Sequence, residues 1–169
     1  MRRVVVGTRA DGTSCVASDG PPALVFRFPD QASPHEVRAE RVAAVPDDLG
    51  PGQGALVEVF MSETLDLDDA GRDLTSLRDS WAVECPPGAT RYRCSVFSPG
   101  RRTAMHRTAT LDYDVVLSGS MTLILGDGSR TELAPGDAVV IPGLDHAWEA
   151  GPEGCVLSVV MIGMNGGAR

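Results

Sequence analysis

The chain has 169 residues, 43% of them hydrophobic, and a formal net charge of −8 at neutral pH. This size and composition predict a single globular domain with enough apolar side chains to form a core. The acidic balance provides no basic stripe for a phosphate backbone, so we expect no nucleic-acid partner.

The basic residues are all arginine. The absence of lysine excludes a P-loop lysine, Schiff-base chemistry and a covalently held pyridoxal cofactor. Behind Arg2 and Arg3, the apolar run Val4–Val6 is too short for a signal peptide or a membrane span, so we expect a cytoplasmic protein with no membrane partner. The four cysteines have no CxxC spacing, which predicts buried, reduced thiols.

The first ninety residues are predicted to add strands to the edges of a β-sandwich. Strand candidates separated by turn-rich stretches are Arg3–Val6, Ser14–Ala17, Leu24–Phe28 and Ala55–Phe60. Residues Glu63–Leu77 are a candidate for a short helix, which Gly71 disfavours. His35 lies in a turn-rich region and is expected at the surface.

From Tyr92 onward, short apolar runs with period-two alternation recur between glycine, proline and aspartate turns. They predict strands at Tyr92–Phe97, Asp112–Leu117, Met121–Leu125, Arg130–Leu133, Ala138–Ile141, His146–Ala150 and Cys155–Ile162. Gly126–Gly128 and Pro135–Asp137 are predicted turns, and Ser118–Ser120 is predicted as a β-hairpin. Seven short strands at this spacing are typical of a sandwich or barrel.

Residues two apart on a strand point to the same face of a sheet. His106 and Thr108 are therefore expected to project together, as are Asp112 and Asp114 on the next strand. Two carboxylates placed side by side raise the pKa of one of them, which makes a candidate general acid or base. An exposed Asp114 at a sheet rim is the alternative. Tyr113 should face the opposite side and pack there.

Further side chains are candidates for the walls of a pocket. His146 and Trp148 share one face of a strand, and Met105 lies next to the first histidine segment. Arg93 and Arg107 are candidates for binding a substrate carboxylate, with surface solvation as the alternative.

Two segments, each bounded by glycines and each containing a histidine, resemble the paired motifs of the cupin superfamily. On the first motif fall Gly100, His106, Asp112 and Gly119, and on the second fall Gly136, Gly143 and His146. The sequence departs from the family pattern in having H-x-T-x3-D in place of H-x-H-x3-E. The resemblance covers Tyr92–Ile162. Within it, the sequence is similar to a subgroup of small bacterial and fungal cupins, many of them encoded near natural-product pathways.

The resemblance implies an all-β, cupin-type double-stranded β-helix, or jelly roll, with extra N-terminal strands. It predicts one domain over residues 1–169, in which 1–90 packs on the barrel, 91–163 is the core and 164–169 is a tail. A homodimer is expected, because dimers are common among such proteins.

The resemblance also predicts a divalent metal held by His106, Asp112 and His146, a two-histidine, one-carboxylate set that suits Fe and can hold Mn, Ni or Zn. The site is then completed by Asp114 as a fourth catalytic candidate and by Met105, Thr108 and Trp148 in the substrate pocket.

The function implied is a small-molecule enzyme, a metal-dependent lyase, decarboxylase, dehydratase or isomerase acting on an organic acid or a polyketide-like intermediate. One alternative is a metal-free epimerase or isomerase in which histidine and aspartate form an acid–base pair. The other is a binding or sensor protein without turnover.

Overall fold

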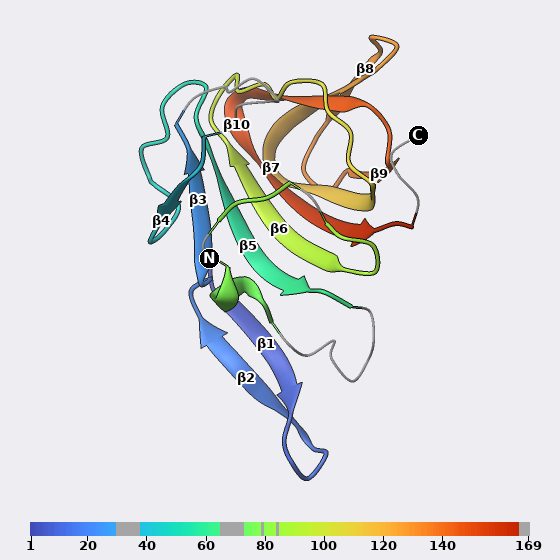
Figure 1. Cartoon of the computed structure of the whole chain (residues 1–169). Coiled ribbons are helices and arrows are strands. Elements are labelled where there is room, and N and C mark those ends of the chain that lie inside the picture. Colours follow the sequence, from blue (N-terminus) through green and yellow to red (C-terminus); the bar gives the residue numbers. More distant parts are fainter. Residues whose placement is uncertain (30–37, 65–72, 79, 84, 166–169) are drawn as a thin grey trace.

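The computed structural model describes residues 1–29, 38–64, 73–78, 80–83 and 85–165 (Figure 1). Across these ranges the regular elements are ten β-strands and one 3-10 turn, η1 (Thr75–Leu77). The expected all-β class is therefore confirmed. Of the candidate helix at 63–77 only η1 is present in the described part, since residues 65–72 lie outside it, as does His35.

Eight strands form one antiparallel sheet in the order β4-β3-β5-β6-β10-β7-β8, with β9 also pairing β7. Their bounds are β3 Leu24–Phe28, β4 Glu40–Val42, β5 Gly54–Ser62, β6 Thr90–Phe97, β7 Thr110–Leu125, β8 Arg130–Leu133, β9 Ala138–Pro142 and β10 His146–Gly163. The sheet curls on itself at the β7, β8, β9 and β10 side, as Figure 1 shows. This curl is the jelly-roll closure that the sequence predicted.

β7 and β10 are long strands that pair with each other from Thr110–Gly163 at one end to Leu125–His146 at the other. Each replaces two predicted strands. The expected hairpin at 118–120 is wrong, because these residues lie inside β7, where Gly119 has a φ of 73° next to an irregularity in the β7–β10 pairing between Ala150 and Cys155. A Cβ there would lie 2.1 Å from the carbonyl oxygen of Gly154, so the strand bends where only glycine fits.

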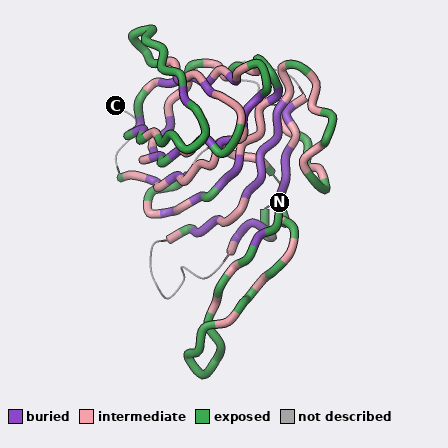
Figure 2. Tube along the Cα trace, turned by 180° about the vertical axis from the view of Figure 1, so that it is seen from behind, coloured by how far each residue is buried: buried purple, intermediate pink, exposed green. Residues whose placement is uncertain are grey.

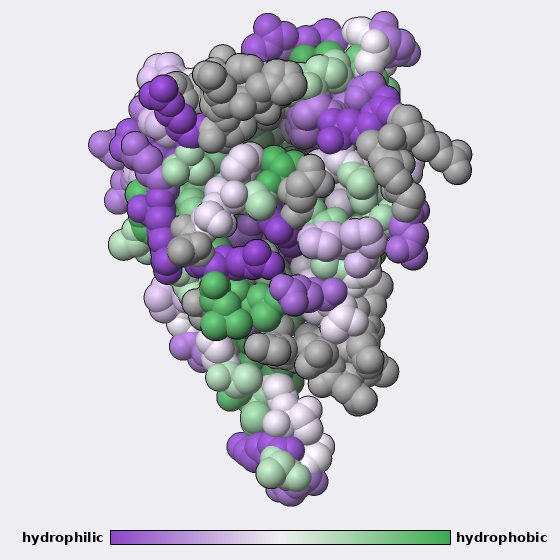
Figure 3. Space-filling view, viewed as in Figure 1, coloured by the Kyte–Doolittle hydropathy of each residue, from purple (hydrophilic) through white to green (hydrophobic). Residues whose placement is uncertain are grey.

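β1 (Arg3–Thr8) and β2 (Ser14–Gly20) form a separate two-stranded sheet that projects from the body (Figure 1). The expectation that all N-terminal strands extend the main sheet is therefore wrong for these two. Arg3 anchors the hairpin: its Nη1 donates to the carbonyl oxygen of Val59 at 3.0 Å and also bonds Asp73. Figure 3 shows an apolar patch over η1, where Leu77 is exposed.

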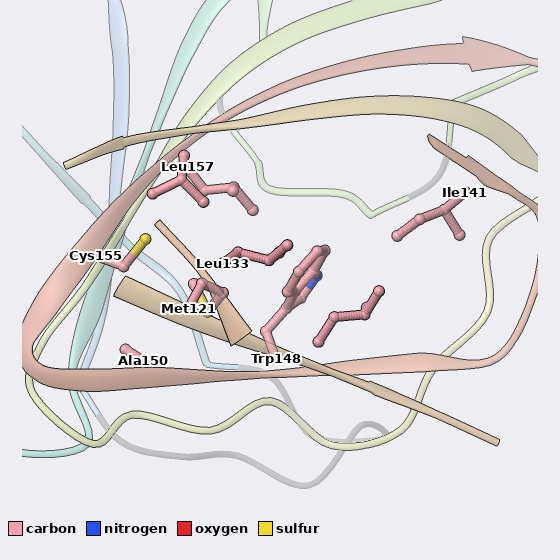
Figure 4. Close-up of a cluster of buried hydrophobic side chains, with 9 residues drawn as sticks. Met121, Leu133, Ile141, Trp148, Ala150, Cys155 and Leu157 are labelled. Carbon is pink, nitrogen blue, oxygen red and sulfur yellow. The ribbon is translucent and has the colours of Figure 1, made fainter. Parts of the chain in front are cut away.

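The largest buried apolar cluster lies inside the curl of β7 to β10 (Figure 4). It comprises Val116, Met121, Leu123, Leu133, Ile141, Trp148, Ala150, Cys155 and Leu157. A second cluster comes from β3 and β5: Leu24, Phe26, Phe28 and Leu56. Burial alternates along the first half of β7, as one-sided packing requires, whereas β3 and β5 are buried along most of their length (Figure 2). Burying each large side chain contributes about 1.5–3 kcal/mol.

All four cysteines are free, three of them buried, as expected. In the described ranges, no helix combines the length and apolar character that crossing a membrane requires.

Candidate functional site

A cavity of about 350 Å³ opens between the two apolar clusters. Its walls come from β3, β5, β6, β7 and β10 and from two irregular segments, 81–83 and 101–108. Six of the seven predicted site residues line it: His106, Thr108, Asp112, Asp114, His146 and Trp148. Met105 is the exception, since its side chain is 41% exposed and lies outside the lining residues. It neighbours His106 in the chain, and adjacent residues of an extended segment point in opposite directions.

His106 and His146 face each other across an isolated antiparallel bridge. The amide of each residue donates to the carbonyl of the other, at 2.9 and 3.0 Å, and the ring centroids are 4.3 Å apart. Each Nδ1 lies 2.9 Å from the carbonyl oxygen two residues earlier, that of Ala104 or Leu144. A carbonyl only accepts, so both Nδ1 atoms carry the proton, and the Nε2 lone pairs remain for a ligand.

His146 is buried, with 3% of its surface exposed. Burial, assisted by the neighbouring His106, lowers the pKa of His146 to about 4, so its ring is neutral at neutral pH. Trp148 packs edge-on against this ring at 5.8 Å. The amide of Trp148 donates to Oγ1 of Thr103, which fastens the 101–108 segment to β10.

Asp112 and Asp114 lie side by side on the inner face of β7, both buried, while Tyr113 between them is 44% exposed. Burial, and then the charge of Asp112, raises the pKa of Asp114 to about 8. Asp114 therefore holds a proton at neutral pH and is a hydrogen-bond donor. Burial also raises the pKa of Asp112, but hydrogen bonding and the positive charge of Arg93 oppose that rise. We therefore assign the charge of the pair to Asp112.

Thr108, which stands where the family pattern has its second histidine, is buried beside Asp112. Its Oγ1 accepts a hydrogen bond from Oγ1 of Thr110 at 2.7 Å. Hydrogen bonding to Thr110 and Thr108 lowers the pKa of Asp112. Both threonines thus favour the carboxylate form of this residue.

Arg93 is buried and belongs to an ion-pair network that the sequence analysis missed. Its Nε donates to Glu58 Oε2 at 3.0 Å, and its Nη2 lies 2.8 Å from Glu58 Oε1. Arg91 approaches the same carboxylate at 3.8 Å, and both arginines donate to the carbonyl oxygen of Ala82. The available signal was Glu58 itself, a lone charge within the apolar run of β5.

Arg107 is held at the cavity mouth by two hydrogen bonds to Asp145, at 2.9 and 2.6 Å. Neither arginine is thus merely solvated, which was the alternative considered from sequence.

The predicted metal centre requires His106, Asp112 and His146 to lie close enough together to share one ion. Over the described part of the chain, no three His, Cys, Asp or Glu side chains lie close enough together to hold a metal ion. Two imidazoles are paired, but Asp112 does not join them as a third ligand. These residues, as they are placed, do not fit the two-histidine, one-carboxylate centre. Metal dependence stays a prediction.

In comparisons with known proteins, no family model matches the chain. It is 40% identical over 62 residues to the "Phomopsin biosynthesis cluster protein C'" of Diaporthe leptostromiformis, covering 37% of this chain and 33% of the relative. It is 36% identical over 52 residues to a "cupin-domain-containing oxidoreductase" of Aspergillus ruber, covering 31% of this chain and 26% of that protein. Over the second of these segments the chain is therefore similar to a cupin-domain protein.

Among solved structures, the polyketide cyclase RemF of Streptomyces resistomycificus is 24% identical, with a TM-score of 0.48, and the match covers 72% of this chain and 78% of RemF. The matches to the fungal proteins span about a third or less of those relatives. The relatives thus share only a segment with this chain. Several of them are named for biosynthesis clusters.

Proposed function

We propose that this protein is a small-molecule enzyme that catalyses proton transfer next to a carbonyl group, as an isomerase or a dehydratase does. One observation carries the proposal. A buried carboxylic acid that keeps its proton at neutral pH, Asp114, lines the same cavity as an imidazole with an open Nε2, His106. A protonated acid and a nitrogen with an open lone pair, lining one cavity, are the two groups that acid–base catalysis requires.

The reaction follows from these two groups. Nε2 of His106 takes a proton from the carbon next to the carbonyl, and the C–H electron pair forms the new C=C bond. The carbonyl π electrons move to oxygen, so an enolate forms, whose oxygen accepts a hydrogen bond from the protonated carboxyl group of Asp114. Return of the proton to a different carbon gives an isomer. Loss of a β-hydroxyl group, protonated by the His106 imidazolium, gives water and an unsaturated ketone.

The aromatic residues that line the cavity favour a largely apolar, planar substrate. Phe28 and Trp81 pack edge-on at 5.4 Å at one side of the cavity, and Trp148 lies at the histidine side. A volume of about 350 Å³ is at the lower end of the range for small-molecule sites.

The relatives named for biosynthesis clusters support a small-molecule reaction, because products of such clusters are assembled from small intermediates. Three relatives are named as oxidoreductases, and that activity is not part of the proposal. The metal-free acid–base alternative is preferred to the metal-dependent one because of the donor set described above.

The test is exchange of the protons next to the carbonyl of 1-tetralone, a planar bicyclic ketone, in D2O, followed by NMR. Wild-type protein is expected to accelerate exchange, and Asp114→Asn and His106→Ala are each expected to lower that rate roughly 10²–10⁴-fold. The exposed substitution Asp48→Asn is the control. Exchange should continue after dialysis against a chelator.

Three outcomes contradict the proposal. They are no acceleration by wild type, full activity of Asp114→Asn, and loss of activity on chelation with recovery on adding a divalent metal. A ligand that raises Tm but returns unchanged, with no exchange in any ketone tried, would favour a binding protein instead.

A further inference from the structure

Arg93 is an unusual residue in a cavity wall, since it is a charged group with only 4% of its surface exposed. It lies on the inner face of β6, in register with Val159, which is in register with Asp114 on β7. The guanidinium and the acid of the proposed reaction thus project from the same rung of the sheet toward the same cavity. Strand spacing puts their Cα atoms about 10 Å apart.

The guanidinium is fixed in orientation. Nε and Nη2 are both committed to Glu58, and Nη2 also donates to the carbonyl oxygen of Ala82 at 2.6 Å. A buried bidentate pair of this kind leaves little rotational freedom, so the remaining nitrogen, Nη1, has a set direction.

Nη1 contacts a residue of β10 that lies next to the carboxylate strand. It donates to Sδ of Met161 at 3.4 Å, and Met161 is in register with Asp112. The charge of Arg93 is felt at Asp112. A thioether is a weak acceptor, so a substrate oxygen in the cavity is a better partner for this N–H than the sulfur it now contacts.

We propose that Arg93 binds the substrate oxygen that gains negative charge during the reaction, as a preorganised oxyanion-binding residue. The inference rests on the proposed proton transfer and adds a substrate requirement to it. The substrate is an uncharged ketone whose enolate is the bound anion, because the charge of Arg93 is already matched by Glu58 before the reaction begins. A fixed positive charge in a dry site stabilises a developing oxyanion at no reorganisation cost.

The experiment uses 2-naphthol, a planar phenol whose oxygen mimics an enolate and whose neutral and anionic forms have different fluorescence spectra. Wild-type protein is expected to bind it as the naphtholate at pH values where free naphthol is neutral, with at least a tenfold shift of the ionisation equilibrium. The ether 2-methoxynaphthalene, which cannot ionise, is the ligand control.

The decisive variant is the double substitution Glu58→Gln and Arg93→Gln, which removes both charges of the bidentate pair and leaves Arg91 its hydrogen bond to the carbonyl oxygen of Ala82. It is expected to bind 2-naphthol in the neutral form and 2-methoxynaphthalene as wild type does. The matched control is Glu149→Gln with Arg130→Gln, a surface pair at 2.5 Å outside the cavity lining. That control should ionise naphthol like wild type.

The inference is overturned if wild type binds only neutral naphthol or none, or if the double glutamine variant ionises it as well as wild type. Should circular dichroism show that variant to be unfolded, Arg93→Lys is measured instead. It keeps the charge but loses the bidentate geometry, so an unchanged ionised fraction overturns the inference. Naphthol ionisation without tetralone exchange would sink the proposed function and leave an anion-binding Arg93, whereas exchange without Arg93-dependent ionisation would do the reverse.

Discussion

His106 and His146 share a pair of backbone hydrogen bonds, and this pairing brings their imidazole rings to 4.3 Å. The rings are oriented by two equivalent bonds from Nδ1 to the carbonyls of Ala104 and Leu144. Both Nε2 atoms are therefore presented by the backbone, before any ligand arrives. The conformational entropy of orienting the two imidazole rings is therefore lost when the chain folds, and not when a ligand binds.

Activity is expected to depend on the proton of Asp114. Because its pKa is raised to about 8 by burial and by Asp112, the acid form is present below that pH and lost above it. The rate of tetralone exchange should therefore fall as pH rises through about 8. Initial rates measured from pH 5 to 10 check this, and a rate that stays constant to pH 10 would remove Asp114 as the acid.

Asp114→Asn is expected to stabilise the protein at high pH. The folded pKa lies above the ordinary value of 3.8, so stability is full below that value and is lost as pH rises from it toward about 8. At pH 8 the loss is on the order of 5 kcal/mol, and asparagine avoids it. Urea unfolding of variant and wild type at pH 5 and pH 8 should show a gap that widens with pH, while Asp48→Asn shows none.

His146 is expected to lower the stability of the fold as pH falls, whereas Asp114 lowers it as pH rises. Its folded pKa of about 4 lies below the ordinary 6.5, so the unfolded chain binds the proton first and stability falls as pH drops from 6.5 to 4. The expected loss is about 3 kcal/mol. His146→Asn should reduce it. Free energies of unfolding at pH 7 and 4.5 give the comparison, and equal losses in the two proteins would contradict the assignment.

Breaking the Glu58–Arg93 pair from one side is expected to be costly. Glu58→Gln leaves a buried guanidinium without its counter-ion, and such changes cost about 3–5 kcal/mol. The matched change on the surface, Glu149→Gln, removes ion pairs to Arg102 and Arg130 and should have little effect. Chemical denaturation measures both. Similar values for the two variants would mean that the buried pair has no special role.

Gly119→Ala is expected to disrupt the bend of β7. Positive φ alone costs about 1–2 kcal/mol for alanine, which is the effect expected at Gly128, where φ is 84° and the space is open. At Gly119 the new Cβ would also clash with the carbonyl of Gly154, so the cost should be larger, at about 3 kcal/mol or more. Thermal unfolding of both variants tests the order, and equal Tm values would refute it.

Alternation and turn residues were enough to predict most of the fold. They located the strands from Tyr92 onward and placed Asp112 and Asp114 on the face opposite Tyr113. They could not show that Gly119 lies inside a strand, because a bulge and a hairpin use the same residue types. They also could not separate the β1–β2 hairpin from the main sheet, since edge pairing is a tertiary choice.

For the site, local pattern predicted which residues line the cavity but not how they pair. The pairing of Glu58 with Arg93 joins residues far apart in sequence, so Glu58 in its apolar run could indicate a buried charge but not which residue pairs with it. The predicted metal set failed to assemble for a similar reason, since a shared strand face does not fix the distance between side chains on different strands. The homodimer stays a prediction.

The two bent strands have a consequence for how this protein could acquire new substrates. β7 carries both carboxylates and β10 carries His146 and Trp148, whereas β3, β5 and the 81–83 segment supply the facing wall. A residue such as Trp81, which is only partly buried, can therefore vary without displacing the strands that carry the proton-transfer groups. Laboratory evolution confined to that wall should change which ketone is accepted while the reaction stays the same.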